Sequence, residues 1–151
     1  MIVIKNTQRT VALNIPKIKR MLQKIVTIIG YDDFDLGVWF ATNKTIQDYN
    51  ATYRNKNKPT DILSFSYHPN LQAGQKIKVT FPEDKNLGDL ILSPEYIQKA
   101  AAEMQQSFEE RLEVLLVHGI CHLLGYDHER DEDFKKMQRK EKMILKKLEN
   151  L

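Results

Sequence analysis

Three histidines, His118, His122 and His128, lie within the short segment HGICHLLGYDH. Residues four apart on a helix project from the same face with a rise of about 6 Å, so His118 and His122 could bind one metal ion. Gly125 is expected to end that helix and reverse the chain, which would bring His128 to the same ion. Three neutral imidazoles leave a fourth position for water, as in catalytic rather than structural zinc sites.

The residue after the first histidine decides which chemistry is available. The spacing H-x-x-x-H-x-x-G-x-x-H is that of the metzincin peptidases, in which a Glu after the first histidine acts as the general base. This chain has Gly119 at that position. Asp127 could be a base instead, but we favour a role in orienting an imidazole. Cys121 is interpreted as a small buried thiol rather than a fourth ligand. Three imidazoles suit Zn²⁺ and would also accept Ni²⁺, cobalt or iron.

A basic segment, YRNKNKPTDILSF, holds the second set of candidate residues. A phosphodiester hydrolase needs cations that stabilise charge on phosphate oxygens, and arginine does this with a bidentate fork. Arg54 stands at the start of this segment, and Lys56 and Lys58 follow as candidate RNA-binding residues. The alternative is an exposed loop that only precedes a strand. The pattern alone leaves both interpretations open.

The net charge of +3 conceals an uneven distribution. Residues 1–60 contain ten Lys or Arg against four Asp or Glu, residues 61–133 contain six against fourteen, and residues 134–151 contain seven against two. The basic flanks could bind a polyanion through its phosphates. Lysine-rich helix faces that are simply solvated would give the same pattern.

The hydrophobic pattern predicts one α+β domain over residues 1–151, without internal repeats. The expected strands cover residues 2–5, 36–41, 62–66 and 88–92, and the expected helices cover 14–30, a short stretch ending near 51, 94–105, 107–125 and a last segment from 131. In the last helix Phe134, Met137, Met143 or Ile144, and Leu148 are expected to face inward.

Composition narrows the class of protein further. The chain has 151 residues, of which 42% are hydrophobic and 28% charged, which is typical of a globular protein. We find no apolar run of about 20 residues that could span a membrane and no signal peptide. One cysteine excludes an internal disulfide, so the expected compartment is the cytoplasm.

Three separated blocks make the chain resemble the YbeY family of bacterial endoribonucleases. The blocks are YRNKNKPTDILSF (Tyr53–Phe65), GDLILS (Gly88–Ser93) and HGICHLLGYDH (His118–His128). The similarity continues into Glu129 and the helix of Met137 and Glu141. The chain departs from the family pattern at Ser66 and Tyr67, where proline is frequent, and at Cys121, where leucine is frequent. None of these three positions is a candidate ligand.

The resemblance implies a zinc ion on His118, His122 and His128, and a need for Arg54 in RNA cleavage. It also implies a single-strand-specific endoribonuclease that matures the 3′ end of the small-subunit (16S) rRNA and takes part in ribosome quality control. The expected partners are the small ribosomal subunit, ribosomal proteins and a ribosome-assembly GTPase. The implied fold is a mixed, mostly parallel four-stranded sheet packed with helices.

Two other functions are compatible with the same predicted metal site. A metallopeptidase of metzincin-like geometry keeps the ligand spacing but lacks the glutamate at position 119. A non-catalytic ribosome-assembly factor would use the metal only to tie the helix to the turn that follows it. We therefore predict a zinc-dependent endoribonuclease, with cleavage activity as the property that separates the three functions.

Overall fold

A four-stranded sheet forms the centre of the computed structural model, which describes residues 1–151. The strands are β1 (Ile2–Asn6), β2 (Asp35–Phe40), β3 (Ile62–Ser66) and β4 (Asn86–Leu92). Their order is β1-β2-β4-β3; the first three in this order run parallel and β3 is antiparallel to β4. This confirms the predicted mixed, mostly parallel sheet.

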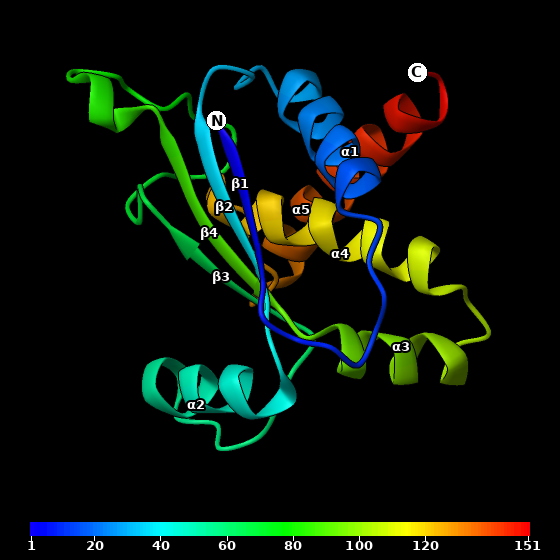
Figure 1. The fold of residues 1–151 in the computed structure, drawn as a ribbon. Helices are drawn as coiled ribbons and strands as arrows, with labels where there is room; N and C mark the ends of the chain where they lie inside the picture. Colours follow the sequence, from blue (N-terminus) through cyan, green and yellow to red (C-terminus); the bar gives the residue numbers. More distant parts are fainter.

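Five α-helices and one short 3₁₀ helix accompany the strands. They are α1 (Ile15–Ile28), α2 (Asn43–Arg54), η1 (Pro82–Asp84), α3 (Pro94–Glu103), α4 (Phe108–Leu123) and α5 (Asp131–Glu149). Three of them, α1, α4 and α5, cover one face of the sheet, whereas α2 lies beyond one end of the strands (Figure 1). None of the helices has both the length and the apolar character needed to cross a bilayer.

The main hydrophobic core lies between the sheet and helices α1, α4 and α5 (Figure 1). Helix α4 is apolar on most of its circumference, because it packs on β3 and β4 on one side and on α5 on another. Leu116, Ile120 and Leu90 are fully buried at this helix–sheet contact. Burial on this scale holds α4 in a fixed position, so polar side chains at its exposed stripe are presented from a rigid support.

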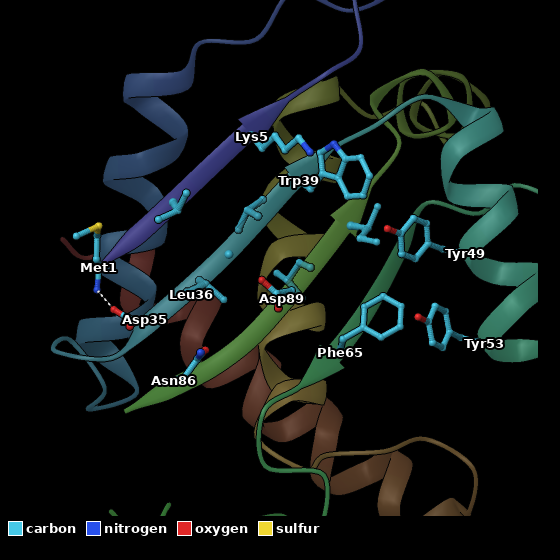
Figure 2. Close-up of a pocket in the computed structure, with 15 residues that line it drawn as sticks. Met1, Lys5, Asp35, Leu36, Trp39, Tyr49, Tyr53, Phe65, Asn86 and Asp89 are labelled. Carbon is cyan, nitrogen blue, oxygen red and sulfur yellow. Dashed lines mark hydrogen bonds and ion pairs between the residues drawn. The ribbon is translucent and has the colours of Figure 1, made fainter. Parts of the chain in front are cut away.

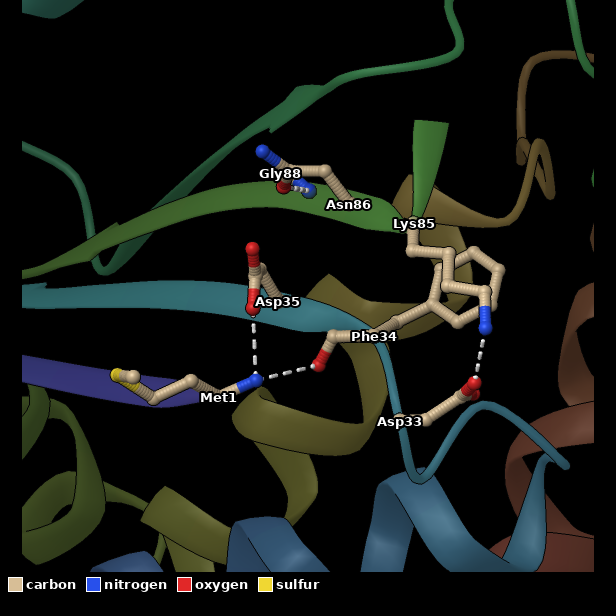
Figure 3. A network of polar contacts seen from close by, with 7 residues as sticks. All are labelled: Met1, Asp33, Phe34, Asp35, Lys85, Asn86 and Gly88. Carbon is tan, nitrogen blue, oxygen red and sulfur yellow. Dashed lines mark hydrogen bonds and ion pairs between the residues drawn. The ribbon is translucent and has the colours of Figure 1, made fainter. Parts of the chain in front are cut away.

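The opposite face of the sheet is open to solvent over β1, β2 and β4 (Figure 2). Val3 is 57% exposed there, in the middle of an edge strand. A network of polar contacts closes one end of this face (Figure 3): the Met1 amino group donates to the Asp35 carboxylate at 2.7 Å, and Lys85 pairs with Asp33 at 2.7 Å. These contacts fix the starts of β2 and β4 beside β1.

Two sequence predictions need correction. Helix α2 runs to Arg54, three residues beyond the predicted end, because Asn55 adopts the left-handed conformation (φ 56°) that terminates helices. Phe134 does not face inward: it is 51% exposed, whereas Met137 and Ile144 are buried as predicted.

Candidate metal centre

The three predicted histidines meet at one point. His118 and His122 project from the same face of α4, and His128 returns to them from the segment after the helix. One ring nitrogen from each histidine lies within 4.8 Å of the others, and the two Nε2 atoms of His118 and His122 are 3.2 Å apart. Two nitrogens on a tetrahedral zinc ion would be separated by about 3.3 Å, since Zn–N bonds are ~2.0–2.1 Å long. The predicted three-His cluster is therefore confirmed.

The return of His128 depends on how α4 ends. The backbone N–H of Tyr126 donates to the Cys121 carbonyl at 3.1 Å, and that of Gly125 donates to the His122 carbonyl at 3.0 Å. This double contact is a Schellman motif, which needs a left-handed residue after the helix. Gly125 has φ +91°, and a Cβ atom there would lie 2.3 Å from the Leu71 carbonyl oxygen. Glycine is thus required both by the turn and by the segment packed against it.

Hydrogen bonds fix the tautomers of two rings. The Nδ1 atom of His118 lies 3.0 Å from a Glu141 carboxylate oxygen, and the Nδ1 atom of His122 lies 2.9 Å from the Tyr126 carbonyl oxygen. Both partners are acceptors, so both Nδ1 atoms carry the hydrogen and donate it. The two Nε2 atoms then carry no hydrogen and face each other with their lone pairs at 3.2 Å. These lone pairs repel each other unless a cation lies between them. The donor set therefore fits a metal ion.

The pKa of His122 also favours the neutral imidazole that binds a metal ion. Burial, and to a smaller extent the neighbouring His118 and His128, lowers the pKa of His122 to about 4. An imidazole with this pKa is neutral at pH 7, the form that binds metal ions.

Glu141, which orients His118, was not singled out as a site residue from the sequence. It lies on α5, 23 residues beyond its partner, and its side chain is only 21% exposed. Its signal is a carboxylate four residues after Met137 and three before Ile144, on the buried stripe of an amphipathic helix. Carboxylates that accept from metal-binding histidines fix the ring and raise its basicity.

Asp127, predicted to orient an imidazole, forms no hydrogen bond with the ring of His118 or His122. Its carboxylate accepts from the backbone N–H of His128 at 2.7 Å, and the side chain is exposed. The rings of His118 and His122 are instead oriented by Glu141 and by the Tyr126 carbonyl. Asp127 therefore shapes the backbone that carries the third histidine; its role as a base stays a prediction.

Gly119 lies on the side of α4 that contacts the sheet. A Cβ atom at this position would be 2.6 Å from Ile62 Cδ1 and 2.9 Å from Leu90 Cδ2. A glutamate there would meet the apolar side chains of β3 and β4 rather than the metal ligands. Cys121 is fully buried, and burial raises the pKa of its thiol to about 12. It takes no part in the three-His cluster, as predicted.

The histidines line a polar cavity of about 390 Å³, which we call the metal cavity. Its walls include Arg54 at the end of α2, Arg111 on α4 and Phe134 on α5. The structure thus brings Arg54 to the histidines, although 64 residues separate it from His118 in the sequence. Lys56 and Lys58 are exposed in the loop after α2 and do not line this cavity.

A larger hollow of about 660 Å³ lies on the open face of the sheet (Figure 2). This sheet-face groove is lined by apolar and aromatic side chains, with Trp39, Tyr49, Tyr53 and Phe65 at one side. The rings contact one another: those of Tyr53 and Phe65 have centroids 5.3 Å apart. The groove contains no group of metal ligands.

Comparison with known proteins agrees with this geometry. The family model described as "Endoribonuclease YbeY" matches residues 3–149. A human protein named endoribonuclease YbeY is 39% identical over 147 residues, which covers 97% of this chain and 87% of the human protein. A relative of the same name from Alkaliphilus metalliredigens is 34% identical over 150 residues, with 95% and 92% of the two chains covered.

A solved structure supports the fold. The solution structure of a Thermotoga maritima protein superimposes with a TM-score of 0.60 at 25% identity, over 99% of this chain and 93% of the other. The family model, the relatives and the three-His cluster agree over nearly the whole length of the chain. The chain therefore belongs to the YbeY family, whose named relatives are endoribonucleases.

Proposed function

We propose that this chain is a zinc-dependent endoribonuclease that cleaves single-stranded RNA. The observation that carries the proposal is the metal cavity, in which three imidazoles and the guanidinium of Arg54 line one hollow. Neutral ligands and a free cation together suit a phosphodiester, whose transition state gains negative charge on its oxygens.

His118, His122 and His128 would hold the ion, which when bound supplies a Lewis acid and lowers the pKa of water. Glu141 and the Tyr126 carbonyl hold two of the rings at fixed angles. Arg54 has no carboxylate partner in the structure, so its five N–H donors are available to phosphate oxygens. Its place at the end of a helix fixes the backbone from which it reaches into the cavity.

The two alternative functions have less support. A metallopeptidase would need a general base beside its first ligand, and position 119 is enclosed by Ile62 and Leu90. A factor with a purely structural metal would not need an open cavity with an unpaired arginine beside the ligands. RNA cleavage would use both the open cavity and the unpaired arginine beside the metal ligands.

The proposed substrate is the 3′ end of the small-subunit (16S) rRNA, with a part in ribosome quality control, as the family resemblance implies. We propose the small ribosomal subunit, ribosomal proteins and a ribosome-assembly GTPase as partners, and the cytoplasm as the location. Helix α1, which carries four of the ten cations of the first basic flank, packs on α5, which carries those of the last. That arrangement supports an RNA-binding surface separate from the cavity.

The test is single-turnover cleavage of labelled single-stranded and double-stranded RNA by protein loaded with zinc. Cleavage of the single-stranded form only, lost in His122→Ala purified in parallel, is the expected result. Equal activity in His122→Ala would identify a contaminating nuclease, and release of peptides from casein by the wild type would favour the peptidase. Binding should also weaken with salt, with a slope of about −0.7 in log affinity against log salt for each phosphate neutralised.

A further inference from the structure

We infer that the metal cavity contains a subsite for the nucleotide next to the scissile phosphate, with Arg111 as its phosphate-binding residue and Phe134 as its base-stacking residue. The inference rests on the proposed function and adds how the RNA strand is held. Both side chains line the cavity with Arg54 and the histidines.

Arg111 lies on the face of α4 that carries the ligands. Positions 111, 115, 118 and 122 follow the three- and four-residue spacing of one helix face, and all four line the cavity. Seven residues separate Arg111 from His118, which is about 10 Å along the axis. The two side chains therefore start from different levels of the cavity wall, and Arg111 is placed to meet a phosphate next to the one at the histidines.

The charge of Arg111 is only loosely neutralised within the protein. Its nearest carboxylate is Asp61, at 3.8 Å, and the other oxygen of Asp61 accepts from the Ile62 backbone N–H at 2.7 Å. The Nε atom of Arg111 is buried and has no hydrogen-bond partner. That buried Nε is out of reach of a ligand, but the side chain is 22% exposed, and its terminal N–H groups have the loose contact with Asp61 as their one polar contact in the protein, so they suit a phosphate in the cavity.

Phe134 provides a different chemistry on the wall formed by α5. Half of this large apolar side chain is exposed, and its ring has no aromatic partner. Three carboxylates, Asp131, Glu132 and Asp133, precede it in the first turn. These charges repel phosphate, so this wall suits a neutral base, while Arg54 and Arg111 on α2 and α4 take the backbone.

The two residues together explain a preference for single strands. A base can stack on an aromatic side chain only when it is free of its own helix, and such stacking is tolerant of sequence. Removing one stacked base typically weakens binding on the order of tenfold. Phe134 therefore selects unpaired nucleotides without reading a particular base.

The test measures binding of zinc-loaded protein to a short single-stranded RNA with phosphorothioate linkages and to a matched strand without bases. A gel run after each measurement checks that the RNA is intact. Wild type should prefer the strand with bases on the order of tenfold, Phe134→Ala should lose this preference, and Phe134→Trp should keep it. In a Trp39→Phe background, the fluorescence of Phe134→Trp should be quenched by the RNA with bases and not by the abasic strand. An unchanged preference in Phe134→Ala, or no quenching, would overturn the stacking role.

Arg111 is tested by the salt dependence of the same binding. Arg111→Gln should reduce the slope by about 0.7, Arg111→Lys should restore it, and Lys99→Gln, an exposed lysine on α3, should leave it unchanged. An Arg111→Gln slope equal to wild type would overturn the phosphate contact. Because binding is measured without cleavage, base preference without any RNase activity would refute the proposed function alone. Cleavage without base preference would refute the subsite alone.

Discussion

The molecule has two hollows, and the smaller one contains the three metal-binding histidines and Arg54. The sheet-face groove, about 660 Å³, is lined mainly by apolar and aromatic side chains that contact one another. The metal cavity, about 390 Å³, collects imidazoles, guanidinium groups and two carboxylates from five separate segments of the chain. The comparison teaches that convergence of polar groups held by hydrogen bonds, rather than volume, identifies a reactive site.

The aromatic side chains of the two hollows differ in the same way. In the groove, Tyr49 stacks on Tyr53 with ring centroids 5.9 Å apart, and the Trp39 ring meets Tyr49 edge-on at 5.6 Å. These rings pack against one another, and such aromatic contacts stabilise the folded protein. Phe134 at the metal cavity has no such partner, so its exposed ring is available to a ligand. Substitutions should therefore affect activity at the cavity and stability at the groove.

The largest expected effect is that of His122→Ala. Loss of one of three ligands should abolish metal binding and lower RNA cleavage at least about a thousandfold, since a metal ion supplies several kcal/mol of charge stabilisation. Elemental analysis and single-turnover kinetics measure both quantities. Tyr49→Phe in the groove is the control and should cleave at the wild-type rate; a metal-replete His122→Ala protein would remove this residue from the site.

Arg54→Ala should come next. The metal content and the fold should be unchanged, because Arg54 is exposed and is not a ligand, whereas the cleavage rate should fall on the order of 10²–10³ through loss of a donor to the phosphate. The matched control is Lys56→Ala, two residues further along the same segment and outside the cavity. Equal losses in both variants would mean that the segment acts only through its net charge.

Glu141→Gln should have a smaller effect, on metal affinity. Replacing the carboxylate that accepts from His118 removes its charge and should weaken metal binding about 10- to 100-fold. Competition with a chelator of known affinity measures the change. The exposed Glu149, near the end of the same helix, offers the control Glu149→Gln. Identical affinities for the two variants would contradict the orienting role of Glu141.

The smallest effect on cleavage is expected in the groove. Trp39→Ala removes a hydrogen bond from the indole N–H to the Thr7 hydroxyl at 2.8 Å and the contact with Tyr49, so the free energy of unfolding should fall by about 1–3 kcal/mol. The cleavage rate of the folded protein should stay within twofold of wild type. Urea unfolding and kinetics on the same sample test this, and a large loss of cleavage in folded protein would place the groove in the active site.

The sequence predicted the parts of the metal centre that depend on local geometry. The spacing of His118 and His122 and the turn at Gly125 follow from helix periodicity and from glycine's tolerance of positive φ. Glu141 could not be assigned in this way, because its contact with His118 depends on how α5 packs on α4. Asp127 was assigned to an imidazole, but a nearby backbone N–H offers it a shorter-range partner.

The place of Arg54 also depends on long-range structure. The strand order β1-β2-β4-β3 puts β3 at the sheet edge, in contact with α4, and α2 is joined to β3 by the basic segment. Asn50 holds that segment by donating to the Lys58 carbonyl at 2.9 Å, from a side chain that is almost fully buried. No local pattern in the sequence gives this pairing, although the family resemblance already assigned Arg54 to RNA cleavage.

The contact of Gly119 with Ile62 and Leu90 limits which enzymes could evolve from this scaffold. Adding the peptidase glutamate would displace the ends of Ile62 and Leu90 and bring a carboxylate among apolar side chains, so Gly119→Glu should lower the free energy of unfolding rather than create a protease. A protein engineer would first have to shorten Ile62 and Leu90, and so give up part of the core. The ligand spacing shared with peptidases is thus separated from their chemistry by a packing barrier rather than by one residue.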